Sequence, residues 1–261
     1  MLRAFSTSAT GMTGQQMMVD TIANNLANVN TTGFKRSQIN FQDLLYVTME
    51  EPGTEIAAGI NSPSGLEIGS GVRAASTIKV FTPGELQNTG NPLDIAITGD
   101  GFLQVTMPNG ELRYTRDGSL MTNANGQLVT TGGYYIEPAI SIPTDVISVS
   151  IEKDGGVNIV DASGAQSVVG TIQLARFPNN SGLSSEGDNL LVETAASGTP
   201  TTGTPGENGF GTIQSGFLEK SNVQMVNELV NLITAQRAYE INSRAIRAGD
   251  DMLRTANEIV R

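Results

Sequence analysis

Cysteine, histidine and tryptophan are absent from this 261-residue chain, and aromatic residues make up only 5% of it. Without cysteine the chain forms no disulfide and no thiolate metal site. Without histidine it lacks the commonest general base and an imidazole ligand, so a Ser-His-Asp nucleophile is excluded. We therefore expect no catalytic residue, no metal, no cofactor and no enzymatic activity.

Basic residues are scarce, with 15 Lys and Arg against 26 Asp and Glu and a net charge of -11. The two ends are nearly balanced: residues 1–36 hold three basic residues and one acid, and residues 222–261 hold five arginines and five acids. The acidic excess therefore lies in the middle of the chain. Because nucleic-acid binding needs a basic surface, no nucleic-acid partner is expected.

A long apolar run is missing near the N-terminus. Arg3 could open a secretory signal, but no continuous apolar stretch follows it. Ser, Thr, Gln and Asn recur through the first 32 residues, which argues against a membrane-spanning helix there. We expect neither a cleaved signal peptide nor direct membrane insertion.

The strongest pattern present lies in residues 222–261. An apolar residue recurs at every seventh position, which is the spacing of a helix that packs along another helix. A second stripe of mostly small residues widens this face, so the helix is expected to have several neighbours. Proline is absent, and Gly249 is the only glycine. The apolar series consists of Met225, Leu232, Tyr239, Ile246, Leu253 and Val260.

A second heptad pattern begins at the N-terminus, where steps of three and four residues run from Leu2 to Leu26. Arg3 and Asp20 are the only charged residues before Thr32, which indicates a helix whose outer face also meets protein. Two arrangements fit: the terminal helices pair within one folded chain, or they complete their burial only between subunits. The residues predicted to pack between subunits are Leu2, Phe5, Met12, Val19 and Leu26 with Met225, Leu229, Leu232, Tyr239, Ile246, Leu253 and Val260.

The middle of the chain has a different pattern. Residues 33–71 are predicted to form an extended connector, which begins with a short strand or a strand and turn at residues 34–46. Residues 47–71 hold Pro52, Pro63 and several Gly, Ser and Glu with little periodicity, which predicts a long extended loop or a hairpin. Residues 72–217 alternate in short segments between turn dipeptides, which predicts an irregular antiparallel barrel or sandwich. Within it, residues 168–177 are predicted to form one long strand and residues 194–211 an exposed loop.

The predicted fold class is therefore α+β, with long N- and C-terminal helices in a coiled-coil-like layer and a central β domain. The expected parts, in chain order, are an N-terminal helix at 1–32, the connector at 33–71, the β-rich domain at 72–217 and a C-terminal helix at 218–261.

Two motifs at opposite ends of the chain resemble those of a known family. The second of them runs from Asn227 to Ile233 and from Gln236 to Glu240. In this order the two motifs resemble those of the flagellar rod and hook proteins, and most closely their distal-rod members. The first motif consists of Ala23, Asn24, Asn25, Leu26, Ala27 and Asn28, followed by Gly33, Phe34 and Lys35.

The resemblance implies a structural subunit of the bacterial flagellar distal rod, involved in motility. Such a subunit polymerises into a hollow helical shaft that transmits torque from motor to hook and conducts exported subunits. Residues 47–71 are similar to an insertion that hook proteins lack and that stiffens the polymer. A proximal-rod or hook protein is the alternative within the family. A secreted β-domain binding module that dimerises through its helices is the alternative from another class.

The resemblance also implies partners and a location. The partners would be further copies of the chain, other rod proteins, the hook protein, periplasmic and outer-membrane ring proteins, the rod cap and the type III export apparatus. The location would be the basal body in the periplasmic space, reached by type III export without a cleaved signal.

Overall fold

The computed structural model describes residues 2–53, 55–57, 60–61, 63–143 and 145–259. Its contacts divide the chain into two compact units. The helical unit is formed by Met1–Leu26, Ser37–Ile78 and Met225–Arg261, and the strand unit by Ala27–Arg36 and Lys79–Gln224. A helix near each end and a strand-rich middle confirm the predicted α+β class. Each unit is built from segments distant in sequence, whereas the parts expected from the sequence follow chain order.

The first helix, α1 (Leu2–Ala27), ends earlier than the predicted bound at residue 32. Beyond it the Thr31 amide donates to the Asn28 carbonyl at 3.2 Å, and the Thr31 hydroxyl donates to the Asn28 side chain at 3.1 Å. Such side-chain contacts offer the backbone an alternative to the helix. They explain why the helical pattern stops at Ala27 although residues 28–32 contain no proline.

The second helix, α2 (Met225–Ile259), begins later than the predicted bound at residue 218. Residues 217–219 belong instead to a strand, β22 (Phe217–Glu219), which pairs with β7 (Leu86–Asn88). Val260, the last residue of the predicted heptad series, lies outside the described residues, as does the side chain of Leu2.

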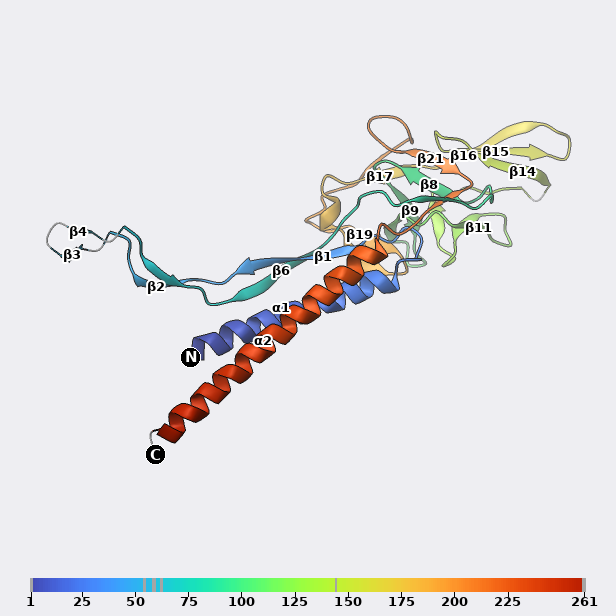
Figure 1. The fold of residues 1–261 in the computed structure, drawn as a ribbon. Coiled ribbons are helices and arrows are strands. Elements are labelled where there is room, and N and C mark those ends of the chain that lie inside the picture. The colour runs from blue at the N-terminus through green and yellow to red at the C-terminus, as the bar shows by residue number, and fades with distance from the viewer. Residues whose placement is uncertain (1, 54, 58–59, 62, 144, 260–261) are drawn as a thin grey trace. The chain divides into compact units, whose positions relative to one another are not determined.

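The two helices lie antiparallel and side by side (Figure 1). Glycine permits this contact at two places. A Cβ added to Gly249 would lie 2.9 Å from the ring of Phe5, and one added to Gly11 would lie 2.9 Å from the side chain of Asn242. Both distances are too short for a real Cβ contact, so the side chains of Phe5 and Asn242 lie directly against the glycines, where a larger residue would displace them.

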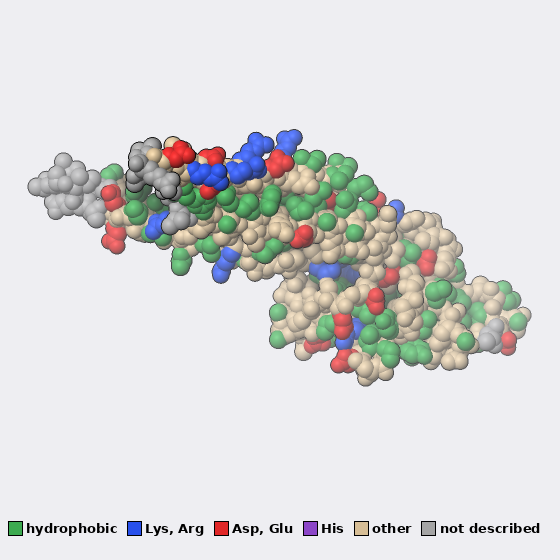
Figure 2. All heavy atoms as spheres, turned by 90° about the horizontal axis from the view of Figure 1, so that it is seen from below, with side chains coloured by type: hydrophobic (Ala, Val, Ile, Leu, Met, Phe, Trp, Pro, Cys, Tyr) green, Lys and Arg blue, Asp and Glu red, His purple; other side chains and the backbone are tan. Residues whose placement is uncertain are grey.

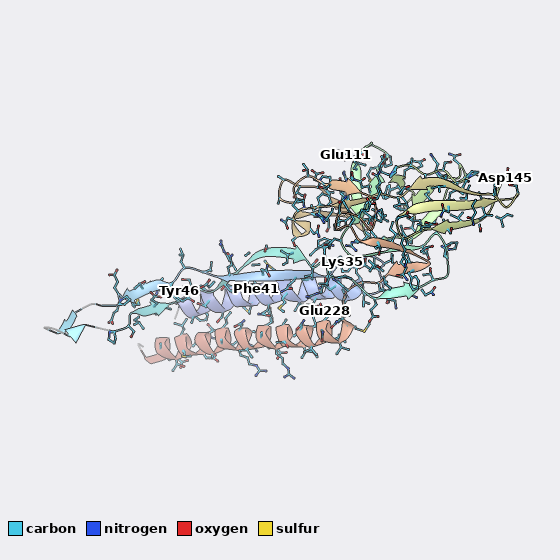
Figure 3. The ribbon with its side chains drawn as sticks, turned by 90° about the horizontal axis from the view of Figure 1, so that it is seen from above. Lys35, Phe41, Tyr46, Glu111, Asp145 and Glu228 are labelled. Carbon is cyan, nitrogen blue, oxygen red and sulfur yellow. The ribbon has the colours of Figure 1, made fainter. Side chains whose placement is uncertain are left out.

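A two-stranded arm, residues 37–78, packs on the other side of α1, so that α1 lies between the arm and α2 (Figure 3). The strands pair in nested order, β1 with β6, β2 with β5 and β3 with β4. For residues 47–71, where the sequence predicts a long loop or a hairpin, the pairing of β2 with β5 and of β3 with β4 shows a hairpin. The strands are β1 (Ser37–Asp43), β2 (Val47–Glu50), β3 (Glu55–Ala57), β4 (Ile60–Asn61), β5 (Leu66–Ile68) and β6 (Val72–Lys79).

The arm is fixed to α1 by close contacts along its inner half. A Cβ added to Gly14 would lie 3.2 Å from Phe41, and one added to Gly71 would lie 2.2 Å from the Thr10 hydroxyl. The amide of Val72 donates to that hydroxyl at 3.4 Å. Farther out, β2, β3 and the described residues of their partners extend past the beginning of α1 (Figure 1). The outer half of the arm therefore lies beyond the described part of α1.

The strand unit contains short strands and one 3-10 turn. These elements are β7 (Leu86–Asn88), β8 (Ile95–Thr98), β9 (Phe102–Thr106), β10 (Leu112–Thr115), β11 (Leu120–Thr122), β12 (Leu128–Thr130), β13 (Tyr135–Glu137), β14 (Val146–Ile151), β15 (Gly156–Asp161), β16 (Gln166–Thr171), β17 (Leu174–Arg176), η1 (Asn180–Gly182), β18 (Ser184–Gly187), β19 (Leu190–Val192), β20 (Thr201–Gly203), β21 (Thr212–Ser215) and β22 (Phe217–Glu219).

The largest sheet of this unit is antiparallel and has nine strands, with β9 at its centre. Its path runs β11-β12-β13-β9-β10-β19-β18. Outside this path, β17 pairs with β9, and β20 pairs with β17. A separate sheet, β14-β15-β16, packs its inner residues against the same core, which includes Ile97, Leu103, Ile159 and Leu174. A second cluster holds aromatic rings in edge contact, with Tyr114 and Phe177 centroids 4.7 Å apart.

Three expectations about the strands need correction. The barrel is not closed, because among the described strands the path of the large sheet ends at β11 and β18. The predicted strand at residues 168–177 is two strands in different sheets, separated where the Ile172 amide donates to the Gly155 carbonyl at 2.8 Å. The predicted exposed loop at 194–211 contains β20, paired with β17, and Ser197 in it is buried.

We expect Gly249→Ile to force α2 away from α1, because the first carbon of the new side chain would already collide with Phe5. Overpacking of this kind destabilises by roughly 1–3 kcal/mol, which exceeds the gain in helix propensity over glycine. Thermal unfolding, followed by the helical circular dichroism signal, should show a lower midpoint. Ala248→Ile is the matched control, since Ala248 is exposed on the same turn. Equal midpoints for both variants would contradict the close packing of the two helices.

Candidate assembly interface

A row of residues at every seventh position marks the side of α2 that faces its own chain. Glu228 and Ala235 are buried, and Asn242 and Gly249 continue the same row as half-buried residues. Glu228 stands in the first turn, where the helix dipole favours a negative charge. These positions lie between those of the predicted apolar series, and two of the four, Ala235 and Gly249, are small. Small residues allow a neighbouring element to pack closely against the helix.

The opposite side of α2 exposes an apolar patch in its first turns. Its members are between 40% and 73% exposed, which is unusual for five large apolar side chains on adjacent turns. Figure 2 shows hydrophobic side chains gathered where α2 begins and charged side chains farther along it. We call these residues the α2 patch: Met225, Val226, Leu229, Val230 and Ile233.

The structure separates the predicted packing residues into two groups. One group is half-buried within the helical unit: Phe5, Met12, Val19, Leu26, Leu232, Ile246 and Leu253. The other group is exposed: Met225, Leu229 and Tyr239. The first group packs inside one chain, as expected if the terminal helices pair within one chain. The second group leaves apolar surface uncovered.

The exposed side of α1 is nearly uncharged. Ala9, Thr13, Gln16 and Met17 are exposed there, and Met17 alone is a large apolar residue. The outer half of the arm is more apolar, and its residues Leu45, Tyr46, Met49, Leu66 and Ile68 are all exposed. Leu45 is the extreme case, with 89% of its surface accessible. Among the described residues of the helical unit, the α2 patch and the outer arm each bring together five exposed apolar side chains.

The motif residues Gly33, Phe34 and Lys35 lie in the strand unit and have contacts within the chain. Lys35 is buried and forms an ion pair with Glu219, while its ammonium group also donates to the Thr82 carbonyl at 2.8 Å (Figure 3). The Phe34 ring lies 5.1 Å from the Lys79 ammonium group. Gly33 has a φ of +67°, and a Cβ there would lie 2.6 Å from the backbone of Arg116. Only glycine fits this position.

Glu219 is the centre of a buried ion cluster. Besides Lys35 it pairs with Arg116 at 3.4 Å and accepts from the Gly84 amide at 2.9 Å. Arg116 also donates to the Gly99 carbonyl at 2.7 Å and lies 5.3 Å from the Phe102 ring. The cluster therefore joins segments from four separate parts of the strand unit. Sequence reasoning identified Lys35 through its motif but had no signal for Glu219 or Arg116.

Burial lowers the pKa of Lys35 from its ordinary value, and the neighbouring Glu219 carboxylate opposes this effect. The pKa of Arg116 is lowered by burial in the same way, again against the attraction of Glu219. The desolvation of the two cations is thus only partly compensated by one carboxylate. Such a cluster becomes strongly destabilising if its single negative charge is removed.

The other half of the first motif closes the end of α1. Asn25 is buried, its amide group donates to the Ser37 carbonyl at 2.9 Å, and its carbonyl accepts from the Ser37 amide at 2.8 Å. This pair of bonds fixes the start of the arm to the last turns of α1. Leu26 is half-buried, and Ala23, Asn24 and Ala27 are exposed. The motif therefore contributes to folding through Asn25, Gly33 and Lys35.

The described residues show no cluster of three metal-ligating side chains. None of their helices is long and apolar enough to cross a membrane. The features that distinguish this chain are exposed apolar surface and the buried ion cluster.

Three family models match the chain. A model described as flagella basal body rod protein matches residues 5–35, the flagellar hook protein FlgE/F/G D1 domain matches residues 96–159, and the flagellar basal body rod FlgEFG protein C-terminal model matches residues 214–259. These segments contain the first motif, the centre of the large sheet and α2.

Curated relatives match over nearly the whole chain. A flagellar basal-body rod protein FlgG from Borreliella burgdorferi is 46% identical, covering 100% of both chains. One from Caulobacter vibrioides is 45% identical over 99% of both chains. One from Bacillus subtilis is 39% identical over 97% of both chains.

Glu219→Gln is expected to lower the stability of the strand unit, because it leaves Lys35 and Arg116 buried without a counter-charge. Breaking a buried pair in this way costs about 3–5 kcal/mol. The measurement is the urea midpoint of the tertiary signal. Glu186→Gln is the control: Glu186 also pairs with an arginine, Arg113, but is about half exposed, so little change is expected. A urea midpoint that falls equally in both variants would show that the buried cluster contributes no more to stability than the exposed ion pair.

Proposed function

This chain belongs to the family of flagellar basal-body rod and hook proteins, and from this membership we propose how it assembles. It is a structural subunit of the flagellar distal rod and not an enzyme. The observation that carries the assembly proposal is the α2 patch, five exposed apolar side chains at the beginning of the longest helix. A subunit that remained alone would keep this surface in water.

We propose that the chain polymerises into a hollow helical tube whose inner wall is formed by the terminal helices in a coiled-coil-like layer. The strand unit, which carries the acidic excess, would stand outside. A helical polymer needs contacts between different patches of neighbouring copies, since a self-complementary contact closes into a dimer. The α2 patch and the outer arm are two such different surfaces on one unit. Burying half of each patch side chain would contribute roughly 5 kcal/mol per contact.

The predicted packing residues then have two proposed roles. Phe5, Met12, Val19, Leu26, Leu232, Ile246 and Leu253 would hold the helix pair in shape. Met225, Leu229 and Tyr239, whose side chains are exposed, would meet the neighbouring copy.

The shaft would transmit torque from motor to hook, and its channel would conduct exported subunits. Its proposed partners are other rod proteins, the hook protein, the surrounding ring proteins of the periplasm and outer membrane, the rod cap and the type III export apparatus. Its proposed location is the periplasmic part of the basal body, reached by type III export without a cleaved signal. The names and the full-length coverage of its relatives support these proposals.

The alternative within the family, a proximal-rod or hook protein, is disfavoured by the full-length similarity to distal-rod relatives. The alternative from another class, a secreted binding module with a dimerising helical hairpin, would use the α2 patch in a closed contact. Sedimentation distinguishes the two classes, since a closed dimer stays small and a rod subunit forms extended polymers at high concentration.

Val230→Asp and Ile233→Asp should prevent polymerisation while the monomer stays folded, because both side chains are exposed in the single chain. An unpaired charge in a buried contact costs several kcal/mol. Sedimentation of concentrated protein measures assembly, and circular dichroism checks the helices. Ala248→Asp, exposed on the charged half of α2, is the matched control and should assemble normally. Normal assembly of the Val230 and Ile233 variants would place the α2 patch outside the subunit contacts.

The outer arm is the second proposed contact, and we propose that it makes the polymer stiff. Leu45, Tyr46, Met49, Leu66 and Ile68 are exposed on a paired hairpin rather than on a loose loop. Pro52 and Pro63 restrict the backbone beyond it. Such a hairpin could wedge between adjacent subunits and block the sliding that lets a tube curve. The apolar contact would then hold neighbouring copies together, and the part of the hairpin beyond it would make the tube rigid.

Removing residues 50–65 tests this wedge, because it shortens the hairpin but keeps the five exposed apolar residues of the outer arm. Joining Met49 to Leu66 through an Asn-Gly turn would retain β1 and β6, which carry the contacts to α1. The variant should still polymerise, but electron micrographs should show curved or flexible filaments. A variant with residues 50–65 replaced by an equally long Gly-Ser segment should behave like the deletion if the ordered hairpin is needed. Filaments of the deletion variant as straight as those of the parent would contradict the wedge.

A further inference from the structure

The sequence contains three Asn-Gly dipeptides, at residues 109–110, 125–126 and 208–209. This dipeptide is chemically labile, because glycine leaves its own amide nitrogen unhindered next to the asparagine side chain. The nitrogen can attack the side-chain carbonyl carbon and close a five-membered succinimide. Whether it does so in a folded protein depends on whether the attacking amide and the side chain are free and well oriented.

Two of the three dipeptides are held by hydrogen bonds. The Gly110 amide donates to the Met107 carbonyl at 2.9 Å, and the side chain of Asn109 bonds to Glu111 through both its nitrogen and its oxygen. The Gly126 amide donates to the Asn123 carbonyl at 2.9 Å. In both places the amide that would attack already donates a hydrogen bond.

The third dipeptide occupies a different turn. Asn208 has a φ of 49° and Gly209 a φ of 80°, and the Phe210 amide donates to the Glu207 carbonyl at 2.8 Å. This is a type I′ turn with Asn-Gly at its centre, a geometry in which the central glycine amide points away from the turn. Within the described part of the chain, neither the Gly209 amide nor the Asn208 side chain has a hydrogen-bond partner, and both residues are exposed.

A cation stands beside the same peptide bond. The guanidinium of Arg176 donates to the Asn208 carbonyl at 3.4 Å and to the Gly209 carbonyl at 3.3 Å, and it lies 5.6 Å from the Phe210 ring. The Asn208 carbonyl belongs to the amide whose nitrogen would attack. When that nitrogen loses its proton, the negative charge is shared with this oxygen. A guanidinium donating to the oxygen stabilises the charge as it develops.

We propose that Asn208 is a site of spontaneous deamidation that is assisted by Arg176. The deprotonated Gly209 nitrogen bonds to the Asn208 side-chain carbon, and the amide nitrogen of that side chain leaves as ammonia after taking up a proton. Water then opens the succinimide at either carbonyl. The products are aspartate and isoaspartate, so the step needs no oxidant and no reactant besides water.

Both products change the turn between β20 and β21. Each adds a negative charge next to Arg176, and isoaspartate also routes the backbone through an additional methylene group. The site lies in the strand unit, so the proposal is independent of the assembly proposed for the helical unit.

The test is a timed incubation of the full chain at neutral pH. Mass spectrometry of proteolytic peptides reports deamidation at each site, and protein isoaspartyl methyltransferase reports isoaspartate. In the folded chain, Asn208 should convert faster than Asn109 and Asn125. In urea the three rates should converge, since all three share the same dipeptide. Equal rates in the folded chain, or an unchanged order of rates in urea, would overturn the geometric argument.

Arg176→Gln tests the assistance. It should slow conversion of Asn208 in the folded chain by about three- to tenfold, less than the loss of a buried oxyanion donor because this site is exposed. Asn109 and Asn125 in the same sample serve as internal controls and should keep their rates, which also shows that the variant remains folded. An unchanged rate at Asn208 would remove Arg176 from the proposal.

Discussion

The strand unit depends on one buried carboxylate. Glu219 lies at the end of the last strand, yet its partners come from the segment after α1, from the segment before β7 and from the strand region around Arg116. Two cations and one anion share a site that is closed to water. Because a charge is costly to bury alone, each member is stable only while the others are in place. The cluster therefore couples the folding of segments that are far apart in sequence.

The helical unit depends on side chains packed against glycines rather than on charge. Gly11 faces α2 and Gly14 faces the arm, so one turn of α1 admits neighbours on both sides. This explains why α1 carries so little charge: two of its sides are occupied within its own chain. Its remaining side and the α2 patch are exposed in the single chain. In the proposed assembly, packing inside the subunit and packing between subunits would therefore use different residues of the same helices.

Much of this architecture could be predicted from sequence, because heptad spacing and turn dipeptides are local signals. The bounds of the helices could not, since α1 ends through side-chain bonds of Asn28 and α2 begins where β22 has taken the preceding residues. The predicted strand at 168–177 shows the same limit. Its residues are uniformly suited to a strand, and the break at Ile172 is imposed by a carbonyl of distant Gly155. The contacts of Lys35 with Glu219 are likewise non-local.

The division of the chain into two units has a mechanical consequence. The backbone passes between the units four times, at residues 26–27, 36–37, 78–79 and 224–225. A domain joined to its neighbour by one linker can rotate about that linker, and the linker alone carries any force between them. Here a twisting force between the units is divided among four backbone connections of one chain. Rotation of one unit against the other would twist these four connections together. The connectivity itself therefore suits a part that must turn without slipping.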